Sequence, residues 1–286
     1  MQPTLQLARA LIDAQFPEYA SLQLVPLPSP GTDNAIFRLG ADRTVRMPRV
    51  EWAKFGAARE IAILPNMTGL GLDIPEPIAL GEASRDFPAP WSILKWVEGE
   101  PATSHTFSTE DARALAGFIA EMQTKAPDAA WAAGEANHFR GVPLVQRTAP
   151  FKAAVDALAD LYDPATLFRI WEAALSAEEE CVAVWLHGDL HGGNLIVRDG
   201  QLCGVIDWGL AGVGDGACDL AAAWALFDGD ARIAFREALS PSQAAWTRGA
   251  GWALSIAAIF LAYYRNKNVP VDGSERTIAR LLEAFP

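Results

Sequence analysis

Two short motifs bring an aspartate, an asparagine and a second aspartate close together in the chain. The first motif runs from His187 to Asn194 and contains Asp189, and the second is centred on Asp207. A carboxylate can orient a hydroxyl group and take its proton, while carboxylate and amide oxygens are good ligands for Mg²⁺. Together they are the residue types that phosphoryl transfer to an alcohol needs, with Asp189 as the base and Asn194 and Asp207 as metal ligands.

A hairpin is expected to bring the two metal-ligand candidates together. Two apolar runs flank Asp199-Gly200, and this dipeptide between such runs is a strong signal for a two-residue turn. Direct pairing across that turn places Asn194 opposite Val205. Asp207 then lies diagonally across the strand pair, at roughly 7–8 Å along the backbone, which allows both side chains to reach one cation.

The order of these residues resembles the kinase catalytic loop, His-x-Asp-x-x-x-x-Asn, followed by a later metal-binding Asp. Here the string is His187-x-Asp189-x-x-x-x-Asn194, and Ile-Asp207-Trp follows it. These motifs resemble those of the aminoglycoside phosphotransferase family more than those of protein kinases, and no Ala-Pro-Glu follows Asp207. The resemblance covers most of the chain. It implies Mg²⁺-dependent transfer of the γ-phosphate of ATP or GTP to a hydroxyl group of a small, aminoglycoside-like molecule.

Other functions fit some of the same residues. Macrolide kinases and other small-alcohol kinases, for choline, homoserine or sugars, are close relatives in fold. Alternatively, His187-x-Asp189-x-His191 suggests the ligand set of a zinc- or iron-dependent hydrolase, although that interpretation leaves Asn194 and Asp207 without a role. An inactive nucleotide-binding module is a third alternative.

The expected elements predict an α+β fold with the two-lobed, protein-kinase-like arrangement. Residues 1–97 form a small, mostly antiparallel β-rich lobe with one main helix, and residues 98–286 form a larger, mostly helical lobe. Residues 96–99 are the expected hinge. Strands are expected at 22–27, 35–39, 44–47, 78–81 and 91–97, and helices at 4–15, 52–64, 109–124, 151–161, 165–177, 218–227, 242–265 and 274–284.

The N-terminal lobe is expected to bind the nucleotide. Arg46, on the third strand, takes the position of the kinase lysine and would hold the inner phosphates, because a guanidinium can fork onto two oxygens. Glu60, on the following helix, is the expected partner of Arg46. The neighbouring Arg59 is expected to face solvent.

Two further segments are candidates for nucleotide contacts. Backbone N–H groups near Thr32 and Asn34, in the turn between the first two strands, could face the phosphates, although an ordinary hairpin turn would have the same sequence. Backbone groups from Lys95 to Val97 would bind the base. Such contacts do not distinguish ATP from GTP.

Two acidic residues after the second motif are expected to be structural. Asp215 lies at a probable helix start and would cap it, and Asp219 would bond the backbone of the catalytic loop. The acceptor would bind between that loop and the helical lobe. Side chains of the last helices could line an apolar acceptor pocket, or be core instead: Trp246, Trp252, Ile256, Phe260 and Tyr263.

The composition is that of a globular protein, with 51% hydrophobic and 20% charged residues. The net charge of −12 argues against nucleic acid as a partner and is compatible with a cationic acceptor. Cys181, Cys203 and Cys218 suggest reduced thiols and a cytoplasmic location. No signal peptide is recognised, and the apolar run 253–264 is too short to span a bilayer, so no membrane partner is expected. The oligomeric state is unknown from the sequence.

Overall fold

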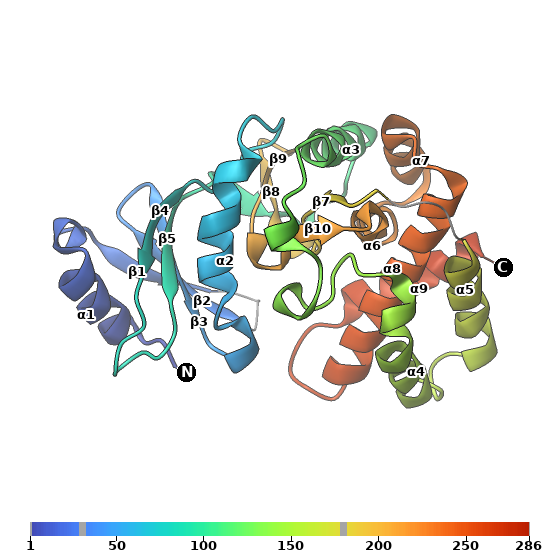
Figure 1. The fold of residues 1–286 in the computed structure, drawn as a ribbon, viewed down its shortest axis with the longest axis horizontal. Coiled ribbons are helices and arrows are strands. Elements are labelled where there is room, and N and C mark those ends of the chain that lie inside the picture. Colours follow the sequence, from blue (N-terminus) through green and yellow to red (C-terminus); the bar gives the residue numbers. More distant parts are fainter. Residues whose placement is uncertain (1, 29–32, 178–181, 286) are drawn as a thin grey trace.

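The chain folds into two lobes, as predicted, each with its own hydrophobic core. The structure is a computed structural model that describes residues 2–28, 33–177 and 182–285. Figure 1 shows the N-terminal sheet in blue and cyan on one side and the helical lobe, from green to red, on the other. The fold is therefore α+β, with a small β-rich lobe followed by a larger helical lobe.

The N-terminal lobe is a five-stranded antiparallel sheet in the order β1-β2-β3-β5-β4. Its strands are β1 (Leu24–Leu27), β2 (Asn34–Leu39), β3 (Arg43–Pro48), β4 (Pro77–Gly81) and β5 (Trp91–Lys95), and helix α1 (Leu5–Gln15) packs on one face. Side chains alternate between the two faces of a strand, so burial of Val45 and Met47 in this core leaves Arg46 on the opposite face. That face meets helix α2 (Gly56–Ile63).

Helix α2 is shorter than the expected helix at 52–64. A 3₁₀ turn, Glu51–Ala53, precedes it, and the α-helix begins only at Gly56. The expected range included Trp52 and Phe55, yet their side chains are exposed and do not belong to the buried face of the helix. At its other end, Ile63 lies in the core of the helical lobe, so α2 contacts both lobes.

The helical lobe is organised around α8 (Gln243–Tyr264), which packs against most of its neighbours. The other helices are α3 (Thr109–Gln123), α4 (Thr148–Ala157), α5 (Pro164–Ser176), α6 (Ala222–Leu226), α7 (Gly229–Leu239) and α9 (Asp272–Ala284). By length and composition the whole of α8 could cross a membrane, whereas its apolar run 253–264 alone is too short to do so. In this fold 67% of its apolar window is buried inside the protein, as in the core helix of a globular domain.

The helices of this lobe differ from the expectation in two places. Helix α7 was not anticipated, and the helix expected at 218–227 consists of a 3₁₀ segment, Gly216–Ala221, followed by α6. For Trp246 and Trp252, the core alternative is the correct one, because both side chains are buried. Phe260 and Tyr263, further along α8, do remain exposed.

Short strands of the helical lobe hold the two motifs. Strand β7 (Val184–Leu186) pairs with β10 (Gly212–Gly214), and β8 (Leu195–Arg198) pairs with β6 (Glu100–Pro101) and β9 (Gln201–Val205). The first motif connects β7 to β8, and the second connects β9 to β10. The predicted turn is present, with Asp199 and Gly200 at φ of 54° and 79°.

The register of this hairpin differs from the expectation by one residue. An irregularity between Ile196 and Val197 makes Leu195, rather than Asn194, the partner of Val205. The carbonyl of Asn194 instead accepts a hydrogen bond from the Ile206 N–H, at 2.9 Å. Asn194 is therefore paired with the residue directly before Asp207, which brings the two metal-ligand candidates closer along the backbone than expected.

Candidate active site

The catalytic loop is held from below by Asp219, as predicted. Its two carboxylate oxygens accept the backbone N–H groups of His187 at 2.7 Å and Gly188 at 2.8 Å. Burial raises the pKa of Asp219 to about 6, although both hydrogen bonds oppose this shift. Asp215 caps the following 3₁₀ segment through the Ala217 N–H and also forms an ion pair with Arg248. Both acids are therefore structural.

His187 is fully buried, and both of its ring nitrogens contact the backbone. Its Nδ1 accepts the Asp189 N–H at 3.3 Å, and its Nε2 lies 3.1 Å from the Ile206 carbonyl, to which it donates. Burial lowers the pKa of His187, so the ring is neutral. Within the described ranges, no three His, Cys, Asp or Glu side chains are arranged to hold a metal ion. The hydrolase interpretation of His187-x-Asp189-x-His191 thus lacks its ligand set.

Asp189 and Asn194 are in direct contact. The Asn194 Nδ2 donates to the Asp189 carbonyl at 3.0 Å and to its Oδ2 at 3.1 Å. This contact uses the amide nitrogen of Asn194, so its Oδ1 is the atom left for a cation. Asp189 stays 26% exposed, which keeps its carboxylate accessible to a substrate hydroxyl group.

Two basic side chains flank the Asp189 carboxylate: Arg140, for which no role was expected, and His191, which was expected as a ligand in the hydrolase alternative. The Arg140 Nη2 lies 3.5 Å from Oδ1, and the His191 Nε2 lies 3.5 Å from Oδ2. Burial by itself would raise the pKa of Asp189, but the hydrogen bond and charge of His191, together with Arg140, hold it well below its usual range. The same pairing outweighs burial and raises the pKa of His191. His191 lies in the motif, whereas no motif marks Arg140.

Arg46 connects Glu60 with Asp207. Its Nη1 lies 2.5 Å and 2.6 Å from the two Glu60 oxygens, and its Nη2 lies 2.6 Å from Asp207 Oδ1. Burial lowers the pKa of Arg46, but the charges of Asp207 and Glu60 outweigh it and raise the value overall. Glu60, which is completely buried, also accepts the Trp208 N–H at 3.0 Å. The predicted Arg46–Glu60 pair is therefore present and reaches the second motif as well.

The backbone around Asp207 is shaped for this contact. Asp207 adopts the left-handed conformation, with φ of 66°, two residues after the end of β9. For a residue other than glycine this conformation is uncommon and marks functional sites. It turns the side chain towards Arg46. With Asn194 Oδ1 it could offer two oxygen atoms to a cation, a number that suits Mg²⁺ because phosphates and water complete its coordination.

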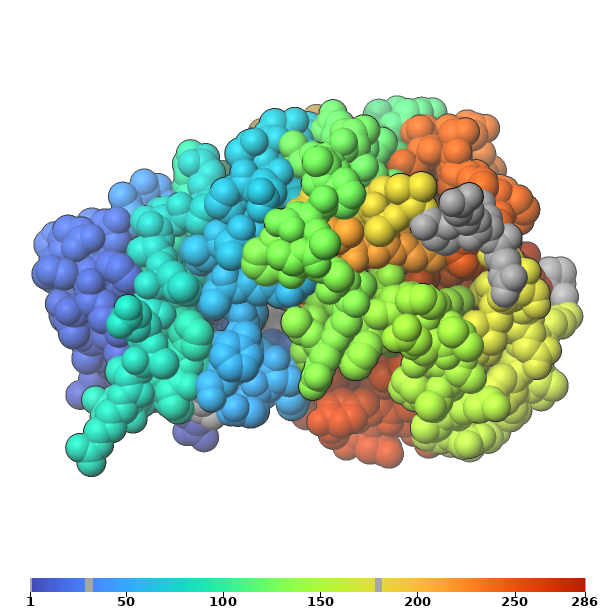
Figure 2. Space-filling view, in the orientation of Figure 1, coloured from blue at the N-terminus to red at the C-terminus, as the bar shows by residue number. Residues whose placement is uncertain are grey.

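The expectation that Arg59 faces solvent is wrong. Its Nε and Nη2 donate to the Ala211 carbonyl at 3.0 Å and 2.7 Å, and its guanidinium lies over the Trp131 ring at 5.2 Å. In the space-filling view of Figure 2, residues of α2 in light blue touch the green segment of the helical lobe that contains Trp131. Arg59 thus fixes α2 to the segment after Asp207.

The other residues expected to contact the nucleotide are Thr32, Asn34, Lys95 and Val97. Thr32 lies outside the described residues, and Asn34 is the first residue of β2. The Lys95 N–H donates to the Glu76 carbonyl, and its side chain pairs with the Glu76 carboxylate at 2.7 Å, so this N–H is not available to a base. Val97 has a buried side chain at the junction of the lobes. Base recognition in this segment stays a prediction.

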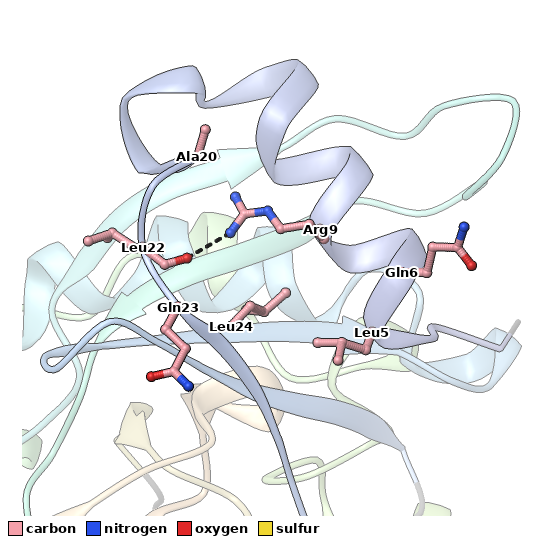
Figure 3. A pocket seen from close by; sticks show the side chains of 7 residues that line it. All are labelled: Leu5, Gln6, Arg9, Ala20, Leu22, Gln23 and Leu24. Atoms are coloured by element: carbon pink, nitrogen blue, oxygen red, sulfur yellow. Dashed lines mark hydrogen bonds between the residues drawn. The ribbon is translucent and has the colours of Figure 1, made fainter.

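A shallow hollow of about 430 Å³ lies outside this site, between α1 and β1. Figure 3 shows its seven lining side chains, among them Arg9, whose guanidinium donates to the Leu22 carbonyl. None of the lining residues belongs to the catalytic set.

The profile of the phosphotransferase enzyme family matches residues 25–252, which is most of the chain and includes both motifs. The chain belongs to this family. Among curated relatives of this phosphotransferase is viomycin phosphotransferase from Streptomyces vinaceus, which is 27% identical over 199 residues, or 64% of this chain and 67% of the relative. The resemblance to the aminoglycoside phosphotransferases stated from the motifs is therefore confirmed.

Solved structures share the fold of this phosphotransferase at low sequence identity. The GDP and kanamycin complex of APH(2″)-IIIa has a TM-score of 0.77 and 17% identity, covering 99% of this chain and all of the other. Macrolide 2′-phosphotransferase MphH from Brachybacterium faecium has a TM-score of 0.62 and 20% identity, covering 97% of both chains. Both are kinase-like, and so is this phosphotransferase.

Proposed function

We propose that this phosphotransferase moves the γ-phosphate of ATP or GTP to a hydroxyl group of a small molecule, with Mg²⁺ as the metal. The observation that carries the proposal is the arrangement of two contacts, Asn194 on Asp189 and Arg46 between Glu60 and Asp207. The first contact orients the carboxylate that would receive the acceptor hydroxyl group. The second contact fixes the guanidinium that would bind the nucleotide phosphates.

Each residue then has a defined task. Asp189 is ionised, accepts a hydrogen bond from the acceptor hydroxyl group, orients it and takes its proton. Asn194 holds the carboxylate in place and, with Asp207, would ligate Mg²⁺, which supplies charge neutralisation for the phosphates. Arg46, fixed by Glu60, contacts the inner phosphates. Because the transition state is loose, positioning and electrostatics account for most of the acceleration.

We infer an aminoglycoside-like, polycationic acceptor. The net charge of −12 attracts cations. Viomycin phosphotransferase is named for such an antibiotic, the structure of APH(2″)-IIIa holds kanamycin, and structures of APH(2″)-IIa, which share the fold, hold gentamicin or streptomycin. A macrolide is the second candidate, because Phe260 and Tyr263 expose aromatic surface on α8 and MphH shares the fold. The free thiols Cys203 and Cys218 support a reducing, cytoplasmic location.

The test is nucleotide consumption with ATP and with GTP across a panel of aminoglycosides, viomycin-like peptides, macrolides, choline, homoserine and sugars. We expect Mg²⁺-dependent turnover on at least one class, with a phosphorylated product in the mass spectrum. The Asp189→Ala variant should lose that turnover while nucleotide binding survives, because Asp189 contacts the acceptor and not the nucleotide. Equal turnover in this variant would remove Asp189 from the mechanism.

A further inference from the structure

Arg140 belongs to a tightly fixed segment that the proposed function has not yet used. Asn137, which is fully buried, organises this segment. Its Oδ1 accepts the Gly134 N–H at 2.9 Å, and its Nδ2 donates to the carbonyls of Arg140 at 2.9 Å and Leu210 at 3.4 Å. Because Leu210 follows the second motif closely, Asn137 ties this segment to the loop that carries Asp207.

The backbone on both sides of Arg140 is unusual and firmly held. His138 and Phe139 have φ of 53° and 58°, in the left-handed region that residues other than glycine rarely adopt. The Arg147 side chain donates to the His138 carbonyl, and the Asp215 N–H donates to the Gly141 carbonyl at 2.8 Å. Strained backbone of this kind persists where the surroundings determine it and is concentrated at functional sites.

This segment also packs directly on the catalytic loop. A Cβ atom placed on Gly188 would lie only 3.0 Å from the Cβ of Arg140. The stem of Arg140 therefore runs along the residue before Asp189, and the guanidinium arrives at the carboxylate from that side. The position of the Arg140 charge is fixed by the fold rather than by its contact with Asp189 alone.

The guanidinium is only partly paired at this position. Its contact with Asp189 is 3.5 Å long, whereas full charge-assisted bonds measure about 2.7–2.9 Å. The Arg140 Nε is buried and has no hydrogen-bond partner among the described residues, while the side chain as a whole is 13% exposed. A buried cation with unused donors next to a catalytic base is costly unless another anionic partner shares it.

We propose that Arg140 is a catalytic residue that binds the oxygens of the phosphoryl group during its transfer to the acceptor at Asp189. The inference rests on the proposed function. In the transfer, the acceptor oxygen forms a bond to the γ-phosphorus as the bond to the β,γ-bridging oxygen breaks. The acceptor proton goes to Asp189, and the nucleoside diphosphate leaves. Arg140 forms hydrogen bonds only.

The charge balance of the step favours this role. Before transfer, the carboxylate of Asp189 compensates Arg140. When Asp189 takes the proton, that compensation ends, and the phosphoryl group, which spreads negative charge over three oxygens, arrives next to the acceptor hydroxyl. Arg46 serves the nucleotide end of the reaction instead, because its guanidinium lies between Glu60 and Asp207 and contacts the inner phosphates. Arg140 and His191 both lie 3.5 Å from the Asp189 carboxylate, and of the two only Arg140 carries a charge that does not depend on protonation.

The experiment compares Arg140→Gln and Arg140→Lys with the wild type, with Arg113→Gln on the exposed face of α3 as the matched control. We expect kcat of Arg140→Gln to fall about 10²–10³-fold, as for the loss of one transition-state donor, with the nucleotide KM nearly unchanged. Arg140→Lys keeps the positive charge but loses the two parallel N–H donors of the guanidinium, so its kcat should lie between those of the wild type and Arg140→Gln. Far-ultraviolet circular dichroism and thermal unfolding verify that each variant is folded.

A binding measurement separates this role from simple positioning of Asp189. The wild type should bind Mg·ADP more tightly when aluminium fluoride and acceptor are added, since the fluoride complex mimics the transferring phosphoryl group. Arg140→Gln should lose that gain and retain its affinity for Mg·ADP alone. A variant with normal kcat, or with reduced kcat and an unchanged fluoride gain, overturns the proposal. If the wild type transfers phosphate to no acceptor, the proposed function fails, which is a different result.

Discussion

The Arg46 bridge offers the sharpest test of the site, because a buried and a more exposed carboxylate share one guanidinium. The Glu60 side chain is 1% exposed, and the Asp207 side chain is 37% exposed. We consider three substitutions, Arg46→Met, Glu60→Gln and Asp207→Asn, singly and in pairs. Glu60→Gln keeps an acceptor for the Trp208 N–H and removes only the charge.

The expected magnitudes follow from burial. Two unit charges about 4 Å apart attract by about 4 kcal/mol at an effective dielectric constant near 20. Removing Arg46 leaves Glu60 charged and buried, so Arg46→Met should cost about 3–5 kcal/mol in unfolding free energy. The coupling between Arg46 and Glu60 should be about 3 kcal/mol. Solvent screening reduces the coupling between Arg46 and Asp207 to about 1 kcal/mol or less.

Urea unfolding of the free protein, followed by circular dichroism, measures these couplings as double-mutant cycles. The exposed pair Arg38–Glu98 is the matched control, with a similar separation of 2.9 Å and an expected coupling below about 1 kcal/mol. The reasoning would be refuted if the Arg46–Glu60 coupling were as small as this control. A larger coupling to Asp207 than to Glu60 would equally contradict it.

Four further outcomes can be measured. Asp207→Ala should weaken Mg²⁺-dependent nucleotide binding, seen by calorimetry, by at least about tenfold, and unchanged affinity would exclude this ligand. Since the pKa of Asp189 is held low, kcat/KM should show no acidic limb from this base between about pH 5 and 8. The pKa of His191 is raised above 6.5, so its pairing stabilises the fold fully below pH 6.5 and is lost as the pH rises through the higher folded value. The loss of unfolding free energy in His191→Gln should therefore shrink in alkaline solution, and growth with pH would refute the pairing. Gly188→Ala and Gly200→Ala both place alanine at φ near +80°, but only at Gly188 would the Cβ meet a carbonyl oxygen, at 2.8 Å. Thermal unfolding should show a loss of about 1 kcal/mol for Gly200→Ala and about 2–4 kcal/mol for Gly188→Ala, and equal losses would disprove the clash.

The sequence predicted those parts of the site that depend on local pattern and fixed spacing. The Asp199-Gly200 turn, the Arg46–Glu60 pair and the support from Asp219 are all present. The turn follows from the backbone freedom of two residues. The other contacts follow from the resemblance, which fixes the order of residues along the chain.

The rest depends on contacts between segments far apart in the chain. The irregularity after Ile196 shifts Asn194 by one pairing position, and no residue type marks it in advance. Whether Arg59 faces solvent depends on how the helical lobe covers α2. The spacing of apolar residues along a helix does not predict such contacts between lobes. Arg140 lies 49 residues before Asp189 and reaches it only through the left-handed turn at His138 and Phe139.

The ion pair between Arg46 and Asp207 has a consequence for the order in which ligands bind. Because an internal guanidinium already occupies the Asp207 carboxylate, the resting protein offers a free divalent ion a largely neutralised site. A triphosphate brings its own negative charge and draws the guanidinium towards itself, which releases the carboxylate. Metal and nucleotide should consequently enter as one complex, and titration of the protein with Mg²⁺ alone should produce little heat.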